Sequence, residues 1–83
     1  MTLGTDDLAW LLAREEERLV ALGYPRRLVV HGLEWARRRA EKAAEPIRSE
    51  ARASARYDVL AGILASGEVE GYLRAERDFL NSL

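Results

Sequence analysis

Residues 6–45 decide the fold, and they read DDLAWLLAREEERLVALGYPRRLVVHGLEWARRRAEKAAE. In the first half, leucines recur with the spacing of one helical face, at Leu8, Leu11, Leu12, Leu19 and Leu22. Gly23 is a residue that commonly ends a helix, and Pro25 suits the first turn of the next one. The sequence therefore predicts a helical hairpin, with one helix over about Asp6–Leu22 and a second over about Pro25–Glu45.

The second predicted helix has a broad apolar face that changes along its length. Its first half carries leucine and valine, at Leu28, Val29 and Leu33, whereas its far half is nearly all alanine. The small alanine side chains allow another helix to approach closely there. Pro46 lacks a backbone N–H and clashes with the preceding turn, so it must kink or end the helix.

Residues 47–66 are again strong helix formers, but their apolar face shifts partway along the segment. The shift predicts a bend or a short break between about Ser49 and Ser54. Ser66 and Gly67 end this element, and a last helix is expected over about Glu68–Asn81. No segment has the alternating pattern of a strand. We therefore predict an all-α protein, a small bundle of three to four helices that consists of the helical hairpin 6–45 and the helices after Pro46.

The length of 83 residues leaves room for one domain, which we expect to span residues 1–83. The absence of cysteine excludes disulfides and thiolate metal sites and favours a reducing compartment. Residues 1–7 carry two acids and no base, unlike a secretory signal, and no apolar run approaches the roughly 18 residues of a membrane span. We expect a cytoplasmic protein without a membrane partner.

The sequence contains no recognisable catalytic motif. His31 is the only histidine, none of the serines stands in a nucleophile motif, and no glycine-rich stretch resembles a phosphate-binding loop. We therefore expect a protein that is not an enzyme and that holds neither a cofactor nor a metal ion.

Two glutamates stand inside apolar stripes. Glu15 lies within the leucine stripe of residues 8–22, and Glu76 lies at the same place in a stripe over residues 69–83 that has identical 4-3-4-3 spacing. A carboxylate buried at such a position would cost several kcal/mol unless it were paired or protonated. Both side chains are therefore expected to find partners or to be shifted in pKa.

Arg39 falls inside the apolar face of the second helix, and His31 lies at its edge. The sequence thus suggests a buried polar cluster of Glu15, Arg39, Glu76 and His31. One interpretation is a buried carboxylate site that binds a cation. The alternatives are a structural ion pair, or a polar position in a subunit interface that sets the helix register.

Charge is distributed unevenly along the chain. The formal net charge is −3 over residues 1–25, +5 over residues 26–56 and −3 over residues 57–83. The arginines that would contact an anion or nucleic acid are Arg26, Arg27, Arg37, Arg38, Arg48, Arg52 and Arg56. Three of them follow at i, i+4 spacing, a like-charged ladder that destabilises an isolated helix.

Several anionic groups could face this ladder. Nucleic-acid phosphates are one possibility; the acidic end segments of the chain or an acidic partner protein are the others. Glutamates interrupt the basic stretch, at Glu34, Glu41, Glu45 and Glu50, and the sequence pI of about 5.8 is low for a DNA-binding domain. Such interleaving is typical of a solvated helix surface.

Three apolar residues lie away from the centres of their helices' core faces: Trp10, Val20 and Val30. Tryptophan is enriched at the energetic centres of protein interfaces, although single exposed hydrophobic residues are also common. We predict a protein–protein interaction module that self-associates or is a small component or regulator of a larger bacterial or phage assembly. The alternative is a nucleic-acid-binding helical protein that uses the basic segment 26–56.

Overall fold

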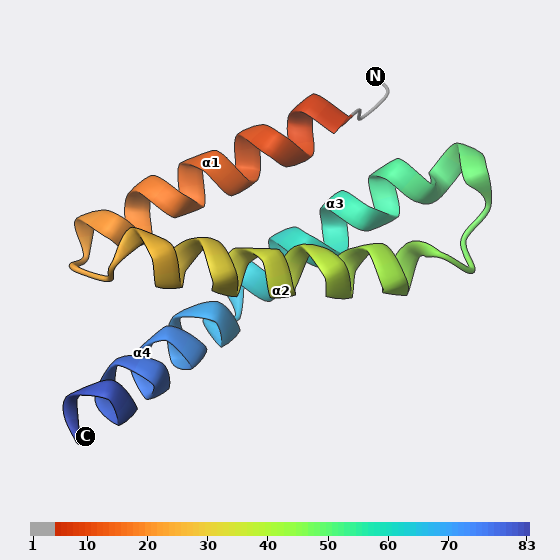
Figure 1. The fold of residues 1–83 in the computed structure, drawn as a ribbon. Coiled ribbons are helices and arrows are strands. Elements are labelled where there is room, and N and C mark those ends of the chain that lie inside the picture. The colour runs from red at the N-terminus through yellow and green to blue at the C-terminus, as the bar shows by residue number, and fades with distance from the viewer. Residues whose placement is uncertain (1–4) are drawn as a thin grey trace.

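The computed structural model describes residues 5–83, with side chains from Asp7 onward. The described chain forms four helices and no strand: α1 (Thr5–Ala21), α2 (Arg26–Ala44), α3 (Ser49–Ala65) and α4 (Glu68–Asn81). The predicted all-α bundle is confirmed, with α1 and α2 as the helical hairpin and two further helices after Pro46 (Figure 1).

The corner between α1 and α2 is a Schellman motif. Gly23 has φ of 102°, and its N–H donates to the Val20 carbonyl at 2.9 Å. The Tyr24 N–H reaches back to the Leu19 carbonyl at 3.4 Å. The side chains of Leu19 and Tyr24 are both buried, which supplies the apolar contact that accompanies this motif.

Pro46 breaks the helix rather than kinking it. α2 ends at Ala44, the Ile47 N–H donates to the Ala44 carbonyl at 3.0 Å, and α3 begins at Ser49. The predicted bend between Ser49 and Ser54 is wrong, because α3 is continuous there. The shift in the apolar pattern arises because Ile47 lies in the connecting turn and belongs to neither helix.

α2 is the central helix, and it packs against each of the other three. The largest fully buried side chains are one from each helix: Leu19, Val29, Leu60 and Leu73. α4 runs antiparallel to α2, since Glu68 at its start bonds to Arg39. The Tyr72 ring stacks on Trp35 with a centroid separation of 6.4 Å.

The molecule is elongated, with extents of 47 × 22 × 18 Å. α1 and α4 cover one end of α2, whereas the far end of α2 and the start of α3 project together as a two-helix hairpin (Figure 1). Three large apolar residues are exposed in the last turns of α1 and α4 or directly after them: Leu22, Phe79 and Leu80. The bundle is too small to cover the last turns of α1 and α4.

At Gly32, α2 approaches the side chains of α4 closely. A Cβ atom at this position would lie 3.3 Å from Leu73 Cδ2 and 3.4 Å from Tyr72 Cδ1. The absence of a side chain therefore lets the two helices meet.

A Gly32→Leu substitution should destabilise the protein by about 1–3 kcal/mol, because the new side chain has no space between α2 and α4. Gly62→Ala is the control: Gly62 is exposed, and no atom lies within 4 Å of its added Cβ. It should stabilise α3 by about 0.5–1 kcal/mol. Urea unfolding followed by circular dichroism measures both changes, and an unchanged stability of the Gly32 variant would contradict the described packing.

Candidate protein-binding surface

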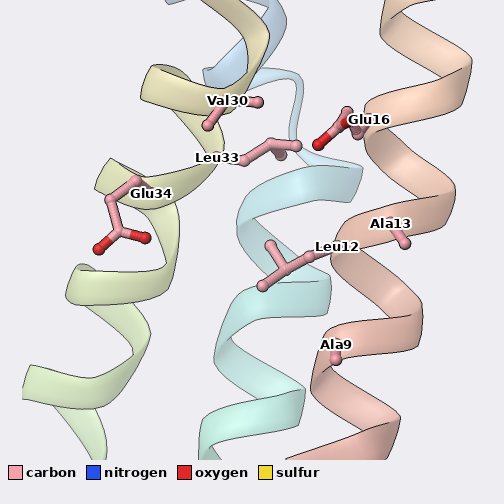
Figure 2. A pocket seen from close by; sticks show the side chains of 7 residues that line it. All are labelled: Ala9, Leu12, Ala13, Glu16, Val30, Leu33 and Glu34. Carbon is pink, nitrogen blue, oxygen red and sulfur yellow. The ribbon is translucent and has the colours of Figure 1, made fainter.

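An open apolar groove of about 320 Å³ lies between α1 and α2. Its lining consists of Ala9, Leu12, Ala13, Glu16, Val30, Leu33 and Glu34. Figure 2 shows Leu12 and Leu33 reaching into the space between the two helices, while Ala9 and Ala13 form the α1 wall. The alanines leave this wall shallow, so the groove is accessible from outside.

The three apolar residues predicted to meet a partner have different environments. Val30 lines the groove and is 48% exposed, and Trp10 is 58% exposed on α1. The Arg14 guanidinium lies 5.3 Å from the centroid of the Trp10 ring. Val20, in contrast, is half-buried and packs against the core. Trp10 and Val30 thus remain available to a partner.

Arginine side chains neutralise both acidic residues of the groove. Arg26 forms an ion pair with Glu16 and also bonds to Glu17 at 2.9 Å. Glu34 accepts from Arg37 Nε at 2.9 Å and Nη2 at 2.5 Å. These Arg37 bonds lower the pKa of Glu34 to about 2 and raise that of Arg37. The groove is therefore an apolar surface bordered by ion pairs, without a free acid or base among its lining residues.

The predicted buried polar cluster does not form among these four side chains: Glu15, Arg39, Glu76 and His31. Glu15 and Glu76 are half-buried, and the other two are exposed. Arg39 bonds to Glu68 at 3.3 Å, and its guanidinium lies 5.1 Å from the Trp35 ring centroid. His31 lies against Tyr72, with the ring centroids 6.3 Å apart. The long side chains reach the helix edges, where surface partners are available.

Glu15 instead shares Arg18 with Glu70 of α4. Arg18 Nε donates to Glu15 at 2.7 Å, and Nη2 donates to Glu70 at 2.5 Å. The hydrogen bond to Glu15, followed by that to Glu70, raises the pKa of Arg18. The two carboxylates that converge are already compensated by one guanidinium, and this arrangement ties α1 to α4.

The seven arginines predicted to bind an anion fall into two groups. Arg26, Arg37 and Arg38 form ion pairs with glutamates of α1 or α2. The others form no ion pair with a carboxylate in the part of the chain that the structure describes: Arg27, Arg48, Arg52 and Arg56. The basic segment is thus not one continuous free surface.

The arginine ladder lies in the projecting hairpin, and its members are not fully solvated. Arg52 and Arg56 are half-buried, whereas Arg48 is exposed. Arg52 Nη2 donates to the Ile47 carbonyl at 3.0 Å, but its Nε is buried without a hydrogen-bond partner among the described residues. An unsatisfied charged donor of this kind is costly.

The sequence pattern did not indicate the groove or the second partner of Arg18. Ala9 and Ala13 are i, i+4 neighbours on α1, and this small-residue spacing is the only local sign of a shallow wall. The choice of Glu70 depends on how α4 packs, which helical periodicity does not determine.

Neither a metal centre nor a membrane span is found in the described residues. No group of three or more His, Cys, Asp or Glu side chains there is arranged to hold a metal ion. None of the four described helices has the length and apolar character needed to cross a bilayer. The chain matches no protein-family model, and no curated protein or solved structure is significantly similar to it.

The Glu34 carboxyl should titrate near pH 2, well below its ordinary value of 4.5. Because the folded state holds the lower pKa, the stabilisation by Arg37 is present above about pH 4.5 and is lost as the pH falls towards 2. Carboxyl NMR titration measures the midpoint directly. Arg37→Gln should return it towards 4.5, and Arg38→Gln, which removes a weaker 3.3 Å bond, should move it less. A wild-type midpoint near 4.5 would contradict this ion pair.

Proposed function

We propose that the protein is a non-enzymatic protein–protein interaction module that binds an apolar helix of a partner in the groove between α1 and α2. The observation that carries the proposal is the groove itself, which has the buried Leu33 and the half-buried Leu12 at its base and the exposed Val30 at its side. A third helix placed on two others buries its apolar face in the manner of helix-in-groove recognition.

The composition of the groove favours a protein ligand over a reactive small molecule. Its surface is aliphatic, and both of its carboxylates are held by arginines. Burial of aliphatic surface contributes about 25 cal/mol per Å². Trp10 is exposed on α1 three residues before the groove residue Ala13, so the two are neighbours on the helix surface, and Trp10 would extend the contact with a large aromatic surface.

A nucleic-acid ligand is the second candidate, and the unpaired ladder of Arg48, Arg52 and Arg56 is the observation that favours it. Phosphate binding needs several free cations on one surface. Since Arg26, Arg37 and Arg38 are engaged with glutamates, fewer cations are available than the sequence suggested. A protein partner therefore remains the better supported proposal.

The photoreactive residue p-benzoylphenylalanine in place of Val30 should form a covalent adduct with a protein on irradiation in the native cells. The same residue in place of Ala21, which is exposed on α1 outside the groove lining, should give little adduct. Ala13→Glu, which places a carboxylate on the groove wall, should abolish the adduct at position 30. Mass spectrometry identifies the partner, and the absence of any protein adduct at position 30 would refute the proposal.

A further inference from the structure

The projecting hairpin and the rest of the molecule carry opposite charge. We call residues 37–56 the arm, and residues 5–36 with 57–83 the head. The arm has seven basic and three acidic side chains, a net charge of +4, whereas the head has six basic and eleven acidic ones, a net charge of −5. The protein is thus a strong electrostatic dipole along its 47 Å axis.

The arm lacks the burial that stabilises the head. Its buried side chains are those of Ala40 and Ala44, and alanine removes little apolar surface from water. The like-charged ladder at i, i+4 spacing and the unpartnered Arg52 Nε add an electrostatic cost. A protein surface that buries part of the arm and brings carboxylates to it would offset both the low apolar burial and the electrostatic cost.

We propose that this surface is the head of a second copy of the chain, in an antiparallel two-fold dimer that places each arm on the acidic head of its partner. This inference rests on the proposed role as a protein–protein interaction module and names a second copy as the partner. A closed two-fold dimer satisfies both arms at once, whereas a parallel dimer would set one +4 arm beside the other. The head offers the exposed carboxylates Asp58 and Asp78, which form no ion pair within the described residues.

The size of the molecule is sufficient for such an interface. A long face of 47 by 22 Å covers about 1,000 Å², compared with the roughly 800 Å² per partner of a stable complex. The exposed apolar side chains, among them Trp10 and Val30, supply affinity. The opposite charges set the antiparallel register and speed the encounter, which makes association sensitive to salt.

Charge favours a second copy over nucleic acid as the occupant of the arm. Glu41, Glu45 and Glu50 lie among the arm's cations, where they repel phosphates. The same carboxylates meet no such penalty against a protein surface that also carries an arginine, such as Arg74 of the head. A mixed surface therefore fits the arm better than a uniform polyanion.

Single-cysteine labelling tests the arrangement, since the chain has no cysteine of its own. Ala51→Cys labels the arm and Ala75→Cys labels α4 of the head, both at exposed positions. Energy transfer should be efficient between a donor dye on the cysteine of one variant and an acceptor dye on the cysteine of the other. It should be weak when both dyes are on Ala51→Cys copies, with a dye pair whose transfer range is well below the 47 Å length of the molecule. Efficient transfer between two arms, or no transfer in any mixture, would overturn the antiparallel dimer.

Charge reversal supplies a second test. The double variant Arg48→Glu, Arg56→Glu should lower the affinity of the dimer about tenfold, which is measured as reduced energy transfer between arm and head. Adding a copy with Asp58→Arg and Asp78→Arg should restore it. Arg27→Glu, a matched reversal on an exposed and unpaired head arginine, should not weaken it. Circular dichroism verifies folding of each variant, and failure of the two reversed copies to complement each other would contradict the inference.

The two proposals fail separately. A groove adduct with a different protein at position 30, together with no energy transfer, would leave the proposed function intact and remove the second copy as partner. Duplex DNA that binds the wild type but not the Arg48→Glu, Arg56→Glu variant, without energy transfer, would assign the arm to nucleic acid. Energy transfer without any adduct at position 30 would keep the dimer and exclude the groove from it.

Discussion

Packing of the other three helices around α2 is the constraint on which the rest of the structure depends. Leu19, Val29, Leu60 and Leu73, one from each helix, close the core where the three helices meet α2. A chain this short buries only about 60% of the surface that its unfolded form exposes. The arm, in contrast to the head, has few large apolar side chains. Its buried side chains are alanines of α2, which pack against the arginine-bearing start of α3.

The same shortage of covering chain accounts for the candidate binding surface. Ala9 and Ala13 leave the α1 wall low, and Val30 remains exposed on the α2 side of the groove. Ion pairs such as Glu34–Arg37 neutralise the charged residues that line the groove. The surface that results is apolar in the middle and polar at its edge, as protein interfaces commonly are.

Helix periodicity and end signals predicted the fold well, because both are local. Gly23 and Pro25 marked the first corner, and Pro46 marked the second to within a few residues. The polar cluster failed because it depended on side-chain reach and helix order: Glu15 bonds to Arg18 three residues away, and Glu70 rather than Glu76 joins them. The groove could not be predicted from the sequence for a related reason, since a hollow between two helices depends on how far the helices diverge.

Sedimentation velocity over a wide concentration range at low salt tests the central claim most directly, namely that a second copy covers the apolar and charged surface that one copy leaves exposed. The account predicts a mass that rises from 9.4 kDa towards twice that value with concentration, and a return to the single-chain mass at high salt. A constant 9.4 kDa at every concentration and salt level would contradict it.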